Sequence, residues 1–146
     1  MHLPILSRHA TSRAAVVAAT GFVVVAAFQL LLALGAPLGK AAWGGSQPTL
    51  PQELRVASSI SMVVFLGAAV AVLGRAGFLG LRYSGAYRVG TWFLAAFMSL
   101  GAVMNLASSS VWERFIWAPV ALVLAVASFL VARGQAGEVA GVDVDR

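Results

Sequence analysis

The sequence contains no cysteine and few charged residues. The absence of cysteine excludes thiol catalysis, disulfide exchange, cysteine-ligated iron–sulfur clusters and cysteine-based zinc sites. Soluble domains carry about 25% charged residues, whereas this chain of 146 residues carries 10%, is 60% hydrophobic and has a mean hydropathy of +0.90. This composition excludes an ordinary soluble domain, a disordered chain and a disulfide scaffold. An integral membrane protein that forms one small bundle is the class that is left.

Histidine is scarce, and its position argues against a bound metal. His2 and His9 are the only two histidines, and both precede the expected first helix. A b-type haem or an intramembrane metal site needs ligands inside the bundle. No charged residue lies in the middle of an apolar run, although proton pumps and ion-coupled transporters usually carry one there. We therefore expect no cofactor and no metal site, and the sequence disfavours energised transport.

Four apolar runs without a charged residue predict four membrane-spanning helices. Each run has about the length needed to cross a hydrocarbon layer of ~30 Å, and a spanning segment must satisfy its backbone hydrogen bonds as a helix. The runs cover residues 14–36, 56–74, 89–110 and 115–132. We predict an all-α fold, a single four-helix transmembrane bundle over residues 14–133, between an N-terminal segment 1–13 and a disordered tail 134–146.

The basic residues set the predicted orientation of the bundle. They are scattered singly and form no basic run, so we expect no nucleic-acid partner. Seven of the ten lie in the two end segments and the second loop, whereas Lys40, Arg55 and Arg114 lie in the first and third loops. Cytoplasmic loops carry the excess of Lys and Arg. We therefore predict a multi-pass protein of the inner (cytoplasmic) cell membrane, with both termini in the cytoplasm.

The first outer loop, residues 37–55, is the longest loop and the richest in turn-forming residues. It holds three of the five prolines, and its Trp43-Gly44-Gly45 segment can adopt turns that are closed to other sequences. A loop with a tryptophan and few charges is expected to lie in the headgroup layer or to fold over the bundle. We therefore predict a structured extracytoplasmic loop.

In this orientation most polar side chains of the spans fall in the outer half of the bundle. Gly101, Asn105, Ser108 and Trp112 follow one another at steps of four, three and four residues, and so share one helix face. One interpretation is a polar chamber, roofed by the first outer loop, that binds a small molecule or a lipid. The alternative is that these groups bond neighbouring helices to one another. The candidate binding residues are Gln29, Trp43, Ser58, Asn105, Ser108 and Trp112.

Five charged residues of the first and third loops would ring the mouth of this chamber. The functional interpretation is that they clamp an anion or take part in acid–base chemistry. The alternative, which we favour, is that they anchor the loops at the interface or pair across them. Carboxylates outside the hydrocarbon layer lack the burial that tunes a group for catalysis. The five residues are Lys40, Glu53, Arg55, Glu113 and Arg114.

The segment that joins the first two spans carries three short motifs. In chain order they are Gly-x-Pro-x-Gly (35–39), Trp-Gly-Gly (43–45) and Leu-Pro-x-x-Leu-Arg (50–55). This pattern resembles that of a group of small, uncharacterised bacterial four-helix integral membrane proteins. The resemblance implies four spans and a defined first outer loop. It implies no catalytic residues, because no activity is assigned to that group.

Three classes of function remain for a protein whose first partner is the lipid bilayer. The first is binding of a small molecule or lipid in the outer chamber, for passive transport or sensing. The second is a structural or accessory subunit of a larger membrane complex, whose polar faces meet a partner protein or a second copy of the chain. The third is a membrane enzyme, which ranks last because no base, nucleophile or metal constellation is visible. Asn105 discriminates between the first two: it faces a cavity in the first, and packs on Gln29 or faces lipid in the second.

Overall fold

The computed structural model of the chain describes residues 7–80 and 84–134. Over these ranges the chain is an all-α four-helix bundle. Each of the four helices of the bundle is long and apolar enough to span a membrane. The elements are α1 (Arg8–Ala33), α2 (Gln52–Arg75), α3 (Ser84–Ala107) and α4 (Ala118–Arg133), with a π-helical segment (Glu113–Trp117) leading into α4. The predicted fold class is confirmed. The predicted tail, apart from Gly134, lies outside the described residues.

The first three helices begin earlier than the apolar runs that predict them. α1 begins at Arg8 and not at Ala14, because the Ser7 hydroxyl accepts a hydrogen bond from the Ala10 N–H at 3.3 Å and caps the helix. It therefore includes His9, which the sequence places before the helix. In the same way α2 begins at residue 52 and α3 at residue 84. An apolar run marks the part of a helix that suits hydrocarbon, whereas caps and polar first turns extend beyond it.

The first helix also ends earlier than expected, at Ala33 and not at Ala36. Gly35 adopts the left-handed conformation, with φ of +88°, and two hydrogen bonds of 3.0 Å close the last turn in the pattern of a Schellman motif. Arg55 of α2 donates from its Nε to the Ala33 carbonyl oxygen at 2.9 Å. The glycine and the arginine of the loop motifs thus end α1 and satisfy its last carbonyl groups.

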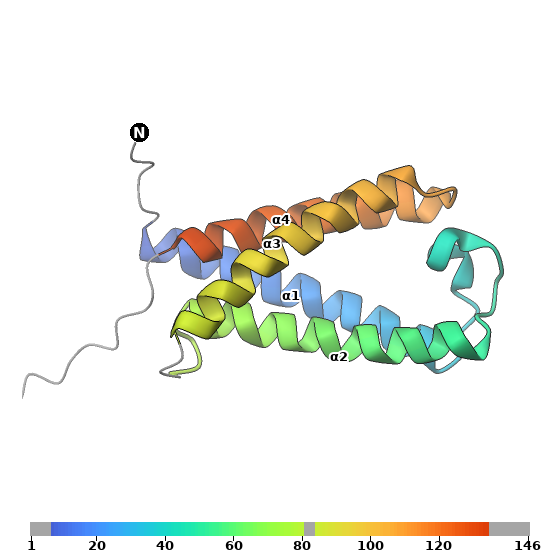
Figure 1. Cartoon of the computed structure of the whole chain (residues 1–146), viewed down its shortest axis with the longest axis horizontal. Helices are drawn as coiled ribbons and strands as arrows, with labels where there is room; N and C mark the ends of the chain where they lie inside the picture. The colour runs from blue at the N-terminus through green and yellow to red at the C-terminus, as the bar shows by residue number, and fades with distance from the viewer. Residues whose placement is uncertain (1–6, 81–83, 135–146) are drawn as a thin grey trace, which may run out of the picture.

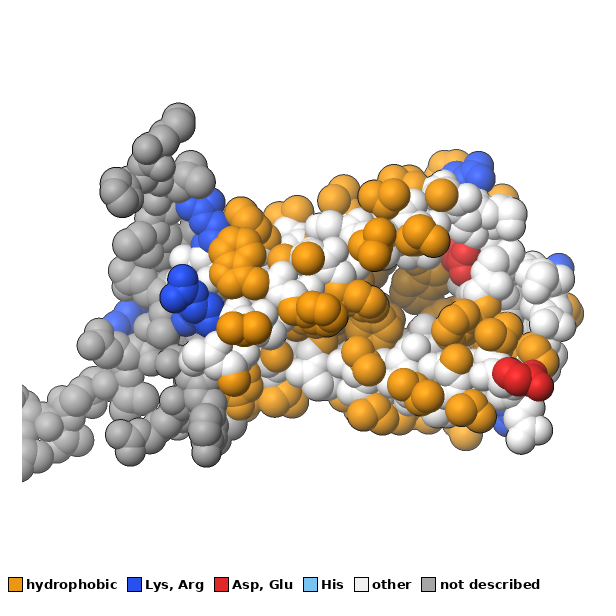
Figure 2. All heavy atoms as spheres, in the orientation of Figure 1, with side chains coloured by type: hydrophobic (Ala, Val, Ile, Leu, Met, Phe, Trp, Pro, Cys, Tyr) orange, Lys and Arg blue, Asp and Glu red, His pale blue; other side chains and the backbone are white. Residues whose placement is uncertain are grey.

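The bundle is built from two antiparallel hairpins, α1 with α2 and α3 with α4, and α1 also packs on α4. Small residues of α1, among them Ala15 and Ala18, are fully buried and belong to the same core cluster as the buried ring of Phe22. Such residues let helix backbones approach closely in a membrane, where packing replaces the hydrophobic drive between helices. Large apolar side chains cover the outward face of the bundle between its two ends (Figure 2). This surface suits contact with lipid.

Helices α2 and α3 lie close at one end of the bundle and separate towards the other (Figure 1). They meet where Gly74 packs against the ring of Tyr87. From there α3 crosses the bundle and ends beside α4. The end at which α2 and α3 separate carries residues 34–51 and 108–112, and is here called the loop end. The candidate site lies at this end.

Candidate functional site

A cavity of about 660 Å³ lies inside the loop end of the bundle. All four helices and the first loop contribute to its lining, and Figure 2 shows its opening as a hollow with acidic atoms at the edge. Its volume falls in the range of about 300–1,000 Å³ that is typical of small-molecule sites. The principal lining residues are Val25, Phe28, Gln29, Trp43, Ser61, Phe65, Met98, Met104, Asn105, Ser108, Glu113, Trp117, Val120 and Ala121.

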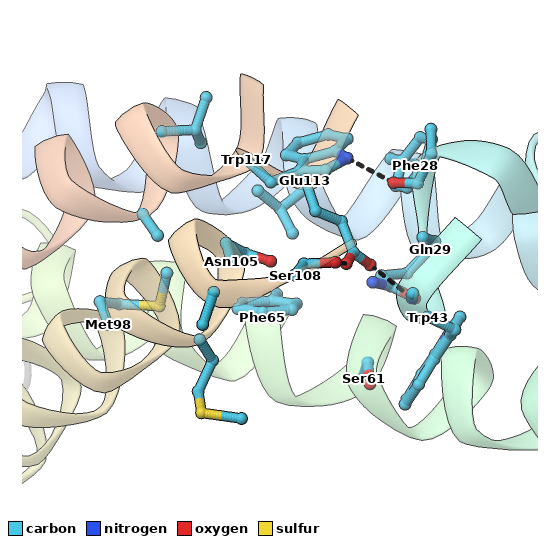
Figure 3. A pocket seen from close by; sticks show the side chains of 18 of the residues that line it. Phe28, Gln29, Trp43, Ser61, Phe65, Met98, Asn105, Ser108, Glu113 and Trp117 are labelled. Carbon is cyan, nitrogen blue, oxygen red and sulfur yellow. Dashed lines mark hydrogen bonds between the residues drawn. The ribbon is translucent and has the colours of Figure 1, made fainter. Parts of the chain in front are cut away.

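The lining is amphipathic along the length of the cavity. Gln29, Ser108 and Glu113 lie towards the first loop together with the rings of Phe28 and Trp43, Asn105 lies beside Phe65 in the middle of the cavity, and Met98 lies farthest from the loop (Figure 3). Met98 lies about two helical turns before Asn105 on α3. A molecule with an apolar chain and a polar head matches this division.

Glu113 is the acidic residue of the lining, and only 9% of its surface is exposed. One of its carboxylate oxygens accepts a hydrogen bond from the Gly44 N–H at 3.0 Å, and the other accepts one from the Ser108 hydroxyl. The Ser108 hydroxyl oxygen in turn accepts from the Ser110 N–H at 3.1 Å. Arg114 follows Glu113 in the chain but donates to the Ser108 carbonyl oxygen at 2.7 Å. In the described part of the chain, neutral donors thus hold the carboxylate.

Residues 38–50 of the first loop form a compact cap over the cavity. The cap contains two 3-10 turns, and its residues Ala42 and Leu50 form a small apolar core with Leu32 of α1. Besides the bond to Glu113, side chains from α2, the π-helical segment and the third loop hold the cap. These bonds are Trp43 Nε1 to Ser58 Oγ at 3.1 Å, Trp117 Nε1 to the Ala41 carbonyl at 2.8 Å, Ser110 Oγ to the Lys40 carbonyl at 2.9 Å and Ser109 Oγ to the Gly44 carbonyl at 3.3 Å.

The backbone of the cap turns through three consecutive left-handed residues. Trp43, Gly44 and Gly45 have φ values of 52°, 82° and 67°. Glycine adopts this conformation freely, whereas a tryptophan is strained in it and stays there only when its surroundings hold it. The hydrogen bond from the Trp43 indole to Ser58 supplies that restraint. The turn is what brings the Gly44 N–H to the Glu113 carboxylate.

The two glycines of this turn allow a matched test of the packing of the cap. A Cβ at Gly45 would lie 2.8 Å from the Lys40 carbonyl oxygen and 3.0 Å from the Ser110 side chain, whereas a Cβ at Gly44 meets nothing within 4 Å. We expect Gly44→Ala to reduce the free energy of unfolding by about 1 kcal/mol, from backbone strain alone. Gly45→Ala adds a clash, and the expected loss is roughly 2–4 kcal/mol. Thermal unfolding in lipid measures both, and equal losses would contradict the contact of the cap with the third loop.

The π-helical segment carries two of the side chains that line the cavity. The Ala118 N–H bonds to the Glu113 carbonyl, five residues earlier, and Pro119 follows at the start of α4 without an N–H group of its own. Glu113 and Trp117, at the two ends of the segment, both line the cavity. The Trp117 ring lies against Phe28, with the ring centres 4.5 Å apart. π-helical turns occur frequently at functional sites, because the extra residue re-aims the side chains of one turn.

The structure brings four of the six predicted binding residues to one cavity: Gln29, Trp43, Asn105 and Ser108. Ser58 lies outside the lining. It is fully buried, and its hydroxyl oxygen accepts the hydrogen bond from Trp43. Its role in the described structure is to hold the cap.

Trp112 lies away from the cavity, although the spacing predicts it on the same face as Asn105. Its side chain is 54% exposed and does not line the cavity. The reason is that α3 ends at Ala107, so the helical spacing that relates residues 101 to 112 stops before Trp112 is reached. Trp117 occupies the wall of the cavity instead.

Among the five predicted mouth charges, Glu113 is the one that lines the cavity. Lys40, Glu53 and Arg114 are exposed, and Arg55 is half-buried against the end of α1. The basic groups bond to backbone carbonyls of their own end of the bundle, as Lys40 does to Ser46 at 3.3 Å. Glu113 joins the first and third loops, as the anchoring interpretation predicts, but through a backbone N–H and not through an ion pair.

Sequence reasoning missed the apolar wall of the cavity. The residues concerned include Phe28, Phe65, Met98, Met104 and Trp117. In a membrane helix, apolar residues face both lipid and the interior, so their type does not reveal which side they face. The polar residues carry the available signal, and the acid beside the serine run 108–110 is the feature that points to Glu113.

Comparisons with known proteins give no indication of function, so the fold and the cavity are the basis of the proposal below. The chain matches no protein-family model, no curated protein and no solved structure. The resemblance of the first loop to a group of bacterial membrane proteins therefore stays a prediction.

Proposed function

We propose that this protein binds an amphipathic small molecule or lipid in the cavity at the loop end, for sensing or passive transfer. The observation that carries the proposal is a cavity with a polar end and an apolar end that opens on the lipid-facing side of the bundle. A cavity formed only by loose helix packing has no reason to separate its polar and apolar lining in this way.

The opening of the cavity supports entry of the ligand from the bilayer. The helices α2 and α3 separate at the loop end, and Met104 of α3 both lines the cavity and is 63% exposed on the outer surface. The lining is therefore continuous with a surface that suits lipid. The cap covers the end of the bundle and is held to α2 and to the third loop, which supports lateral entry over entry from water.

The predicted orientation places the cavity in the outer half of the membrane. Seven of the ten basic residues belong to the end segments and the second loop, and the five of them that the structure describes, Arg8, Arg13, Arg75, Arg88 and Arg133, lie at the opposite end of the bundle from the cap. By the excess of basic residues in cytoplasmic loops, we propose that the cap is extracytoplasmic. The ligand would then come from the outer leaflet of the cytoplasmic membrane.

Asn105 offers a direct test of binding. Its side chain points into the cavity (Figure 3), and within the described ranges it forms no side-chain hydrogen bond with protein. We expect Asn105→Leu to keep the fold and to lower the occupancy by ligand about tenfold, because one hydrogen bond to the ligand head is lost. Native mass spectrometry of protein extracted gently from its own membrane measures the occupancy as an added mass.

The control for this test is Ser99→Leu on the same helix, since the Ser99 hydroxyl bonds to the Ala95 carbonyl at 2.8 Å and lies outside the cavity lining. It should leave the added mass unchanged. A protein-sized adduct without a small ligand would overturn the proposal in favour of an accessory subunit.

A further inference from the structure

We infer that the ligand of this cavity carries a cationic head group, such as a primary ammonium, which the Glu113 carboxylate binds. This inference rests on the proposed binding of an amphiphile. It adds the charge of the head group, which decides which molecules of a membrane can occupy the site.

The first argument is the state of the Glu113 carboxylate. It lies at the polar end of a largely apolar cavity, it is buried, and both of its oxygens accept hydrogen bonds from neutral groups. A carboxylate has about four acceptor positions, so two donors leave part of its capacity free. A buried charge is costly unless an opposite charge accompanies it.

The second argument is that the described basic residues of the loop end are engaged elsewhere. Arg114 donates to the Ser108 carbonyl, Lys40 to the Ser46 carbonyl and Arg55 to the Ala33 carbonyl. Of these three side chains, none lines the cavity. A cation that reaches Glu113 in the cavity therefore has to come from the ligand.

The third argument is the donor set of the ligand head group, given the amide that lies next to Glu113. The Gln29 Oε1 atom is buried and has no hydrogen-bond partner within the described structure, and Gln29 lines the polar end beside Glu113 (Figure 3). A primary ammonium has three N–H donors and no acceptor. It can therefore fill the acceptor positions that remain on the Glu113 carboxylate, whereas an anionic head group would meet a like charge.

The test compares three probes with the same apolar chain: dodecylammonium, dodecanol and dodecanoate, each with bromine at the chain end. The protein carries Trp92→Phe and Trp112→Phe, so that the remaining tryptophans, Trp43 and Trp117, both line the cavity and report binding through fluorescence quenching. Measurements are made in phosphatidylcholine nanodiscs, and each affinity is expressed per mole fraction of probe in the bilayer. We expect dodecylammonium to bind at least about tenfold more tightly than dodecanol, and dodecanoate to bind most weakly.

Variants assign this preference to Glu113. Glu113→Gln should reduce the ratio of ammonium to alcohol affinity to about one, and Glu113→Asp should retain a preference for ammonium. Glu53→Gln is the matched control, because Glu53 is an exposed acid at the same end of the bundle and lies outside the cavity. It should keep the full ratio.

Each outcome decides one of the two proposals. Equal binding of ammonium and alcohol to the protein with native Glu113 would overturn the cationic head group and leave amphiphile binding intact. A preference that persists in Glu113→Gln would also overturn it. Absence of quenching by all three probes would refute the proposed function itself. If Glu113→Gln does not fold, the ratio measured with native Glu113 still decides the inference.

Discussion

Replacement of Ala121 by phenylalanine is expected to weaken amphiphile binding by about a hundredfold or more, the largest effect that we predict. Ala121 is buried on α4 and lines the cavity. A phenylalanine ring at this position would fill the space that the apolar chain of a ligand needs, so the contacts that give binding its free energy are lost. Titration with dodecylammonium in nanodiscs measures the affinity.

The stability of this variant separates blocking of the cavity from general damage. A side chain that fills an existing void should change the free energy of unfolding by no more than about 1 kcal/mol, whereas overpacking of a closed core costs about 1–3 kcal/mol. The control is Val123→Phe, which adds the same ring to an exposed position of α4 outside the cavity lining. Normal binding by a folded Ala121→Phe variant would show that the ligand does not use this cavity.

Replacement of Glu113 by leucine is expected to release the cap and to reduce the free energy of unfolding by roughly 2–5 kcal/mol. The variant removes the carboxylate that accepts from the Gly44 N–H and from the Ser108 hydroxyl, and a hydrogen bond to a charged group contributes about 1.5–3 kcal/mol. Hydrogen exchange of the cap amides, read together with thermal unfolding, should show the loss concentrated in residues 38–50.

The exposed acid Glu53 again provides the comparison. Glu53→Leu should change stability by no more than about 0.5 kcal/mol, because the side chain is exposed and outside the cavity lining. If Glu113→Leu leaves the exchange of the Gly44 amide as slow as before, the carboxylate does not hold the cap.

The bundle could be predicted from the sequence because the bilayer imposes one solution on long apolar runs. Four such runs without a charge can cross hydrocarbon only as helices, and residues 7–80 and 84–134 contain four helices that fit this description. The helix ends could not be read from hydropathy. The Ser7 cap and the Schellman turn at Gly35 set the ends of α1, and both act through backbone hydrogen bonds outside the apolar run.

The candidate site could be predicted only in its polar half. Gln29, Asn105 and Ser108 stand out because polar groups are rare in spans, and the structure gathers them at one cavity. The partner of the Gly44 turn is Glu113, which is 69 residues away in the chain. Such a pairing depends on how the helices pack against one another. The periodicity of apolar residues does not reveal this packing in helices that are apolar on all sides. The choice of Trp117 over Trp112 has the same origin, because it depends on where α3 ends and the π-helical segment begins.

The most direct test of amphiphile binding in this cavity uses two methionines of α3 as probes. Met98 and Met104 both line the cavity, but Met98 is 6% exposed whereas Met104 is 63% exposed. Bilayer lipid can therefore touch the Met104 methyl group from outside, while a chain reaches Met98 only through the cavity. With labelled methionine methyl groups in deuterated nanodiscs, nuclear Overhauser effects from protonated dodecylammonium should appear at Met98 as well as at Met104. Effects at Met104 alone would mean that the chain stays in the bilayer, and would contradict the proposed function.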